Sequence, residues 1–265
     1  MPLRIAILGI NGRLGQAIGR EACIDDRFSL TGGIVRADSE ESGQDIGEIL
    51  GGPELGYQAC VSLEEGTRDC DILIDASTPD ACIAAAERLS GRDNFCFVTG
   101  VTGLDEDQRT RLKAASKTLP VMAARNFSVG IAVLESLAAR AAGVLPSTLW
   151  DAEIEETHHR RKVDAPSGTA LILGEAVAGA RKQSLDRVRK DDRRGRRLTG
   201  DIGFAVTRGG GIIGEHAVRF LSELEEIALV HKAHDRRIFA QGALEAAAWL
   251  HGRPPGLYGM TDLMG

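Results

Sequence analysis

Two adjacent histidines and a nearby lysine, His158, His159 and Lys162, form a dense group of proton-carrying side chains. The segment 163–170, Val-Asp-Ala-Pro-Ser-Gly-Thr-Ala, follows directly and leads into an apolar run, which predicts a turn that opens a helix. The first turn of a helix favours a carboxylate or phosphate, because its backbone N–H groups have no intrahelical partners. The combination predicts an anion-binding reaction site. The structural alternative is a solvated basic turn before an ordinary capped helix.

A glycine-rich turn near the start of the sequence is the second candidate site. The nearly continuous apolar segment 3–8 predicts a strand, and it is followed by Gly-Ile-Asn-Gly-Arg-Leu-Gly at 9–15 and a helix-like segment. In a dinucleotide-binding turn, Gly9 would permit the tight bend, Gly12 the approach of a pyrophosphate, and Gly15 close packing of helix on sheet. The spacing is GxxGxxG rather than GxGxxG, so a purely structural glycine turn is the alternative.

The end of the second predicted strand bears on the choice of nucleotide. That strand covers residues 28–35 and is followed by Arg36. In Rossmann sheets an acid at this place accepts the ribose 2′-OH, whereas an arginine pairs with a 2′-phosphate. Arg36 therefore favours NADP, while Asp38 and Glu40 keep NAD as an alternative. The structural alternative for Arg36 is a solvated loop cation.

Strands and helices alternate through the first half, with strand-like segments at 71–75 and 94–99 and alanine-rich helical segments between strands. This alternation predicts a parallel sheet covered by helices. Ligands of such sheets bind beyond the carboxyl ends of the strands, which points to residues 76–78, 100–103 and 123–127. Ordinary turn chemistry is the alternative, since Ser, Thr, Gly and Asn are common in turns.

The organisation changes after Asn126. Helices are predicted at 130–142, from 168 onward and at 236–250, and strands at 152–156, 203–208, 214–221 and 225–232. Because hairpin-length segments separate the last three strands, we expect a mostly antiparallel sheet in an α+β second domain.

Composition and charge narrow the class of function. The chain has 265 residues and a net charge of −6, which argues against nucleic acid as the main partner, and its basic run at 187–197 contains acids and predicts a solvated loop. Five cysteines without a CxxC pair predict reduced thiols in a cytoplasmic protein, and without zinc-like spacing we expect no metal. The sequence has no leader-like segment and no apolar run of roughly 18 residues, so we expect no association with a membrane.

Together these motifs resemble the 4-hydroxy-tetrahydrodipicolinate reductase family, formerly called dihydrodipicolinate reductases, over essentially the whole chain. The motifs are GxxGRxG at 9–15, GxTG at 100–103, NFSVG at 126–130, HHxxKxDAPSGTA at 158–170, GEH at 214–216 and HKA at 231–233. The segment 158–170 is much more specific to this family than any dinucleotide fingerprint.

The resemblance implies an α/β fold with two domains. A Rossmann-like, parallel-sheet dinucleotide-binding domain would span 1–126 and be re-entered by 236–265, and an α+β substrate-binding and tetramerisation domain would span 127–235. It also implies a homotetramer. The implied activity is NAD(P)H-dependent reduction of 4-hydroxy-tetrahydrodipicolinate to tetrahydrodipicolinate, with loss of water, in the diaminopimelate pathway of lysine biosynthesis.

The same resemblance implies roles for individual residues. His158 and Lys162 would be catalytic, and the small dicarboxylate substrate would bind to His159, Ser167, Gly168 and Thr169. The expected cofactor-binding residues are Gly9, Ile10, Asn11, Gly12, Arg13, Leu14, Arg36, Gly100, Val101, Thr102, Ala124, Arg125, Asn126 and Phe127. Many members carry an acid immediately before the arginine, where this chain has Val35, so NADPH is the preferred cofactor and NADH the alternative.

In the implied reaction, hydride reaches C4 of a cyclic, imine-conjugated dicarboxylate, and negative charge moves toward the ring nitrogen and C3. Lys162 is the expected proton donor, and His158 an acid or electrostatic stabiliser. One competing function is another nicotinamide-dependent amino-acid dehydrogenase, such as aspartate or diaminopimelate dehydrogenase, which would not need the segment 158–162. The other is a non-catalytic nucleotide-binding regulator, in which a missing Lys162 or a broken Ser-Gly-Thr turn would be expected.

Overall fold

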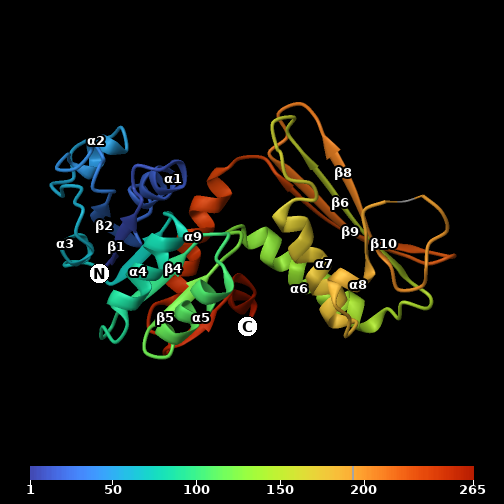
Figure 1. Cartoon of the computed structure of the whole chain (residues 1–265). Coiled ribbons are helices and arrows are strands. Elements are labelled where there is room, and N and C mark those ends of the chain that lie inside the picture. Colours follow the sequence, from blue (N-terminus) through green and yellow to red (C-terminus); the bar gives the residue numbers. More distant parts are fainter. Residues whose placement is uncertain (193) are drawn as a thin grey trace. The chain divides into compact units, whose positions relative to one another are not determined.

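The computed structural model of the chain describes residues 1–192 and 194–265, and these residues form two compact units. Unit 1 consists of Met1–Ser128, Arg237–Leu263 and Gly265, and unit 2 of Val129–Arg236 and Met264. In Figure 1 the red helix α9 (Arg237–Leu250) lies among the blue and green elements of unit 1. The chain therefore completes unit 2 before it returns to unit 1.

Unit 1 is built on a six-stranded sheet in which every pairing is parallel, in the order β11-β5-β4-β3-β1-β2. The strands are β1 (Leu3–Leu8), β2 (Phe28–Ile34), β3 (Ile72–Asp75), β4 (Cys96–Thr99), β5 (Pro120–Ala123) and β11 (Gly256–Tyr258). This is the doubly wound arrangement expected from the alternation of strands and helices, and it brings the carboxyl ends of the strands to one edge. Strand β11 was not predicted.

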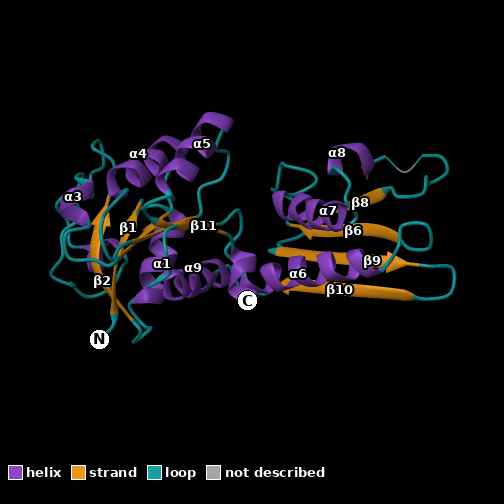
Figure 2. Cartoon of the chain, turned by 90° about the horizontal axis from the view of Figure 1, so that it is seen from below, coloured by secondary structure: helices purple, strands orange, loops and turns teal. Residues whose placement is uncertain are grey.

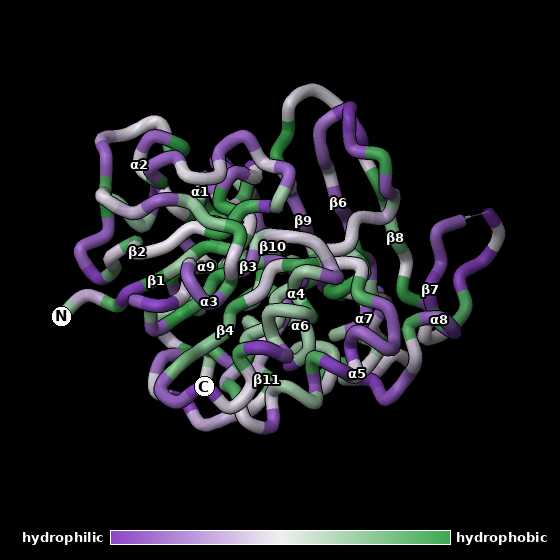
Figure 3. The backbone as a smooth tube through the Cα atoms, turned by 60° about the vertical axis from the view of Figure 1, so that its left-hand side comes forward, coloured by the Kyte–Doolittle hydropathy of each residue, from purple (hydrophilic) through white to green (hydrophobic). Residues whose placement is uncertain are grey.

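Helices cover both faces of this sheet. They are α1 (Arg13–Ala22), α2 (Ile46–Ile49), α3 (Leu63–Gly66), α4 (Pro79–Leu89), α5 (Glu106–Ala115) and α9, and a 3₁₀ helix spans Met260–Met264. Figure 2 shows α3, α4 and α5 on one side of the strands and α1 and α9 on the other. The central strands β3 and β4 are buried along their whole length, and each is apolar apart from its last residue. Figure 3 shows green, hydrophobic tube along β4 and purple, hydrophilic tube in many loops.

The glycine turn after β1 has the backbone geometry that its sequence predicts. Gly9 has a φ of +80°, a conformation that favours glycine. A Cβ at position 15 would lie 2.1 Å from the Gly9 carbonyl oxygen, so only glycine lets α1 approach this closely. The turn therefore brings the first turn of α1 against the carboxyl end of β1.

Unit 2 contains a five-stranded mixed sheet in the order β10-β9-β6-β8-β7. Its elements are α6 (Val129–Val144), β6 (Asp151–His158), α7 (Gly168–Ala180), α8 (Leu185–Val188), β7 (Arg189–Lys190), β8 (Ile202–Arg208), β9 (Gly214–Leu221) and β10 (Glu226–Ala233). β9 pairs antiparallel with β10 and with β6, as expected, but β8 pairs parallel with β6 and with β7. The short segment between β8 and β9 does not form a hairpin, because β6 lies between them.

Alternation along β6 separates its two faces. Ala152 and Ile154 are buried and pack in one core with residues of α6 and α7, whereas the residues between them are only partly buried. Figure 2 shows α6 and α7 along the strands of this sheet. Side chains at even positions of β6 therefore face the helices, and those at odd positions face the other side of the sheet.

The basic run at 187–197 is not uniformly a solvated loop. Arg197 is 17% exposed and contacts Asp151 (Nε to Oδ1, 2.8 Å), Glu153 and the Ala152 carbonyl oxygen. Arg194, in contrast, is exposed and pairs with Asp192. The expectation of a solvated loop is thus wrong for Arg197, which folds back against β6. Residue 193 lies outside the described part of the chain.

None of the helices within residues 1–192 and 194–265 is long and apolar enough to cross a membrane.

Candidate active site

The last two even positions of β6 place a carboxylate and an imidazole on the same face of the sheet. Glu156 is 2% exposed and His158 is 9% exposed. Glu156 Oε2 lies 2.5 Å from His158 Nδ1. A buried, acidic side chain is therefore placed directly beside a histidine of the cluster singled out in the sequence.

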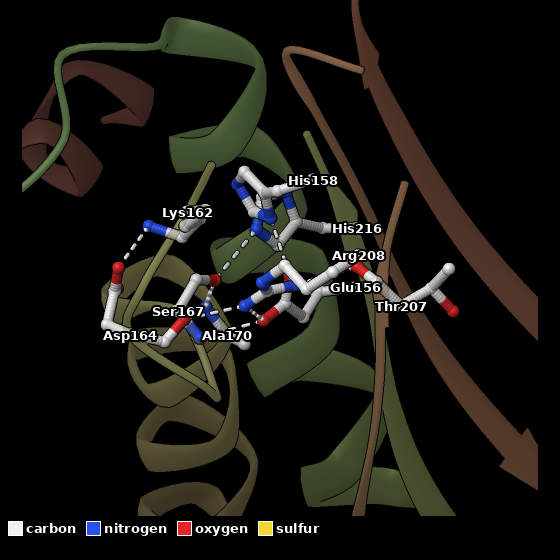
Figure 4. Close-up of polar contacts among 9 residues, drawn as sticks. All are labelled: Glu156, His158, Lys162, Asp164, Ser167, Ala170, Thr207, Arg208 and His216. Carbon is white, nitrogen blue, oxygen red and sulfur yellow. Dashed lines mark hydrogen bonds and ion pairs between the residues drawn. The ribbon is translucent and has the colours of Figure 1, made fainter. Parts of the chain in front are cut away.

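Glu156 accepts hydrogen bonds from three directions (Figure 4). Besides His158, the Arg208 guanidinium donates to both carboxylate oxygens (2.8 and 2.7 Å), and the Ser167 N–H donates to Oε1 (2.9 Å). Burial alone would raise the pKa of Glu156, but the bonds from His158, Arg208 and Ser167 outweigh it and lower that pKa to about 2. The carboxylate is therefore ionised near neutral pH.

The ionised carboxylate determines how the His158 ring is protonated. A carboxylate can only accept hydrogen bonds, so Nδ1 of His158 carries the hydrogen that it donates to Glu156. Nε2 is the ring atom that is left for exchange of a proton. A Cβ at position 214 would lie 3.1 Å from Nε2, so Gly214 keeps room on that side of the ring.

A second histidine packs against this pair. The His216 ring makes an edge-to-face contact with the His158 ring, with centroids 5.1 Å apart, and its Nε2 lies 3.3 Å from Ser167 Oγ. Burial, and to a smaller degree the nearby His158, lower the pKa of His216 to about 3. His216 is therefore a neutral ring near neutral pH. Ser167 Oγ also accepts the Ala170 N–H (3.2 Å) and so caps α7.

The loop between β6 and α7 adds positive charge to the site. Lys162 Nζ lies 2.9 Å from Asp164 Oδ1, and the lysine side chain is 21% exposed. Partial burial, together with Arg161 and Arg236, lowers the pKa of His159. A Cβ at Gly168 would meet no atom within 4 Å, so the N-terminus of α7 is open at this residue. This arrangement suits a small anion.

A pocket of about 840 Å³ lies at the carboxyl edge of the unit 1 sheet. Among the residues that line it are Gly9, Asn11, Gly12, Val35, Arg36, Ser77 and Thr78. The glycine turn, the open first turn of α1 and an arginine after β2 fit the pyrophosphate and ribose of a dinucleotide.

Side chains of the loop after β2 tie it to the glycine turn. Asn11 Nδ2 donates to Ser39 Oγ (3.1 Å) and Glu41 Oε2 (3.3 Å). Arg36 is 80% exposed, and its Nε lies 3.7 Å from Asp38 Oδ1. Because this ion pair is long and exposed, a nucleotide phosphate can compete for the guanidinium.

The predicted cofactor residues 100–102 and 124–127 follow β4 and β5 at the same edge of the sheet. Gly100 and Phe127 are in contact, since a Cβ at position 100 would lie 2.3 Å from the Phe127 ring. The Phe127 side chain is buried, as is that of Ile10, which packs beside Gly33. Ile10 and Phe127 can therefore offer a ligand mainly their backbone atoms.

Three residues of this site, Glu156, Arg208 and His216, received no role from the sequence. A usable signal existed for Glu156. In a strand with period-two burial, a glutamate two positions before a histidine must share its face. Arg208 and His216 come from β8 and β9, and only the pairing of both strands with β6 brings them to Glu156.

Comparison with known proteins gives consistent matches over the whole chain. The family model described as dihydrodipicolinate reductase, N-terminus, matches residues 3–127, and that described as dihydrodipicolinate reductase, C-terminus, matches residues 130–264. The chain is 42% identical to the 4-hydroxy-tetrahydrodipicolinate reductase of Caulobacter vibrioides, with 100% of this chain and 98% of that protein covered. It is also 42% identical to the same enzyme of Thiobacillus denitrificans, with 100% and 99% covered.

A solved structure with the same fold is the dipicolinate-bound dihydrodipicolinate reductase of Paenisporosarcina sp. TG-14. The match has a TM-score of 0.80 and covers 99% of this chain and 100% of that one, at 22% identity. At this identity the likeness concerns the fold.

Proposed function

Because this chain belongs to the dihydrodipicolinate reductase family, we propose that the cluster around His158 is its reaction site. The family activity is NAD(P)H-dependent reduction of 4-hydroxy-tetrahydrodipicolinate, with loss of water, in the diaminopimelate route to lysine. The observation that carries the assignment of the site is the buried contact between Glu156 and His158, next to Lys162 and the open end of α7. The matches over both units favour this function over the other dehydrogenases and over a silent regulator.

Residues of the chain donate the proton and bind the substrate carboxylates. The nicotinamide cofactor supplies the hydride when it is bound. Lys162 donates a proton to the ring position that gains negative charge, and protonated His158, through Nε2, stabilises that charge. His159, Ser167, Gly168 and Thr169 bind the substrate, with one carboxylate at the N-terminus of α7. The direct test is a coupled assay with enzymatically generated substrate, in which NADPH and NADH oxidation are followed in parallel.

The open position at Gly168 leads to a prediction for substrate affinity. In Gly168→Val, the new side chain would occupy the space before the first N–H groups of α7, and we expect KM to rise roughly tenfold to a hundredfold. Folding should be unaffected, because no atom lies within 4 Å of a Cβ there. Steady-state kinetics measures the change. Gly179→Val, at the other end of α7 and equally uncrowded, is the matched control, and an unchanged KM in Gly168→Val would contradict the carboxylate site.

We propose that the cofactor binds in the unit 1 pocket and that NADPH is preferred. Gly9, Asn11 and Gly12 would hold the pyrophosphate, and Arg36 the 2′-phosphate. The remaining predicted cofactor residues are Ile10, Arg13, Leu14, Gly100, Val101, Thr102, Ala124, Arg125, Asn126 and Phe127. Support comes from the pocket, which contains the glycine turn and Arg36 together, and from Val35, which brings no acid to compete for the arginine.

Arg36→Ala is expected to weaken NADPH binding about tenfold to a hundredfold and to spare NADH, because a charge-assisted contact is worth roughly 1.5–3 kcal/mol. Calorimetric titration of both nucleotides measures this, and higher salt should narrow the wild-type preference. Arg88→Ala is the matched control, since Arg88 lines the same pocket but is paired with Glu64. An equal loss for both nucleotides would show that Arg36 does not distinguish the phosphate.

We further propose a homotetramer assembled through the unit 2 sheets, in the cytoplasm. The support is the sheet face opposite α6 and α7, which carries the exposed Val230 and an ion-paired group of Glu155, Arg219 and Glu226. For the compartment, the support is five free cysteines, of which burial raises the pKa of Cys70 to about 12 and of Cys96 to about 11. Light scattering on the full chain measures the assembly.

A further inference from the structure

We propose that Glu156 and Arg208 act together as positioning residues for His158, in which Glu156 holds Nδ1–H and Arg208 offsets the charge of the carboxylate. The inference rests on the proposed role of His158 in the reaction. Neither Glu156 nor Arg208 needs to touch the substrate.

Hydrogen bonds hold the Glu156 carboxylate in place. Glu156 is fixed by four hydrogen bonds from three elements, because Arg208 Nη1 and Nη2 (β8) and the Ser167 N–H (start of α7) all donate to it besides His158. The Arg208 guanidinium is itself held, since Nη2 also donates to the Asp164 carbonyl oxygen (2.6 Å). A carboxylate with so little freedom fixes the plane and the tautomer of the ring that donates to it.

The two ring nitrogens of His158 have different roles. The hydrogen on Nδ1 stays in the bond to Glu156 throughout the reaction. The exchangeable proton is on Nε2, which Gly214 leaves uncrowded. When Nε2 loses its proton, the ring becomes neutral, and a proton taken up from solvent restores the charged form that stabilises the substrate. A neutral ring with its hydrogen on Nε2 and none on Nδ1 would lose the bond to the carboxylate, so Glu156 excludes that form.

Titratable and charged groups from several elements surround the His158 ring. Some of these groups face His158 directly, and others lie next to the groups that face it. They are Glu156 on the same strand, Arg208 on β8, His216 on β9, His231 on β10, and His159, Lys162 and Asp164 in the loop before α7. The pKa of His216, about 3, keeps it neutral, and Lys162 is paired with Asp164. Removing the charge of either Glu156 or Arg208 therefore changes the electrostatic environment of Nδ1 most directly.

The two substitutions should have opposite effects. In Arg208→Gln the carboxylate is no longer offset, so protonated His158 is favoured and its titration midpoint should rise by about one pH unit or more. In Glu156→Gln the guanidinium is left beside the ring, so the midpoint should fall by a similar amount, and both neutral tautomers should appear. Arg208→Lys keeps the charge and should move the midpoint little.

The measurement is the ¹⁵N and ¹H NMR titration of the His158 ring in the full-length wild type and variants, together with kcat and KM against pH. We expect the NMR midpoint and the pH profile of kcat to shift together, with KM changed less. Two outcomes would overturn the inference. One is a shift of the His158 midpoint in the same direction in Arg208→Gln and Glu156→Gln, and the other is a neutral wild-type ring that carries its hydrogen on Nε2. A merely structural role would not produce opposite shifts.

Controls separate this inference from the proposed function. Glu155→Gln, one residue earlier on the opposite face of β6, should leave the His158 titration unchanged, and light scattering should verify its assembly. If the ring titrates as expected but kcat does not follow, His158 is positioned as proposed and only its catalytic role fails. If Glu156→Gln does not fold, the comparison of Arg208→Gln with Arg208→Lys decides. A rise of the His158 midpoint only in Arg208→Gln supports the inference, and equal midpoints in the two variants contradict it.

Discussion

Lys162→Ala is expected to lower kcat by a factor on the order of 10²–10⁴, the range usual for loss of a general acid. NADPH affinity should change little, because the residues predicted to hold its pyrophosphate and 2′-phosphate are those of the glycine turn and Arg36, and Lys162 is not among them. In the structure Lys162 Nζ pairs with Asp164, which holds the ammonium within the loop between β6 and α7. The measurement is steady-state kinetics of the coupled reaction, with nucleotide affinity from calorimetry.

Lys162→Arg distinguishes a proton donor from a positive charge. A guanidinium keeps the charge but does not give up its proton at working pH, so this variant should restore part of the substrate affinity and little of kcat. Arg161→Ala, an exposed neighbour in the same loop, is the control for loss of charge alone. Turnover close to wild type in Lys162→Ala would eliminate Lys162 as the donor.

His216→Asn should make unit 2 less sensitive to acid. Burial, with a smaller contribution from His158, lowers the pKa of His216 to about 3, whereas a histidine in an unfolded chain titrates near pH 6.5. Above about pH 6.5 the ring is neutral in both states. As the pH falls from there toward 3, the unfolded chain binds a proton that the folded chain does not bind, so stability is progressively lost.

The size of this effect follows from the same two values. Between pH 7 and pH 4 the wild type should lose roughly 3 kcal/mol more of its free energy of unfolding than His216→Asn, an upper range for a single buried histidine. Urea unfolding can be followed through Trp150, which packs beside the unit 2 core, in a Trp249→Phe background at fixed protein concentration. The same acid sensitivity in both proteins would show that His216 is not held neutral.

The segment 158–170 and the glycine turn at 9–15 could be singled out from the sequence because each is local. His158, Lys162 and the Ser-Gly-Thr turn lie within a dozen residues, and the segment itself identifies the family that the comparisons confirm. The glycine turn after β1 is equally local, and its positive φ at Gly9 follows from residue type and place. Their roles in catalysis and binding stay predictions until the variants are measured.

What the sequence did not reveal depends on pairing between distant strands. The spacing places Glu156, and not Glu155, on the face of His158, but only the structure shows that this face of β6 is the buried one. Arg208 could not be assigned to Glu156 without the parallel pairing of β8 with β6, and the short link between β8 and β9 suggested another arrangement. Local spacing predicts hairpins well, but it does not show when a third strand lies between two others.

The return of the chain to unit 1 has a consequence for synthesis on the ribosome. Helix α9 packs against α1, β4 and β5, β11 completes the edge of the sheet beside β5, and Gly242 is so close to the Phe127 carbonyl that a Cβ would lie 1.7 Å from it. These contacts cannot form until residues 129–236 have been made, which takes roughly 5–20 s at an elongation rate of about 5–20 residues per second. During that interval β5 has an unpaired edge and one face of the nascent sheet lacks α9, so the growing chain exposes apolar strand surface that can pair with another chain.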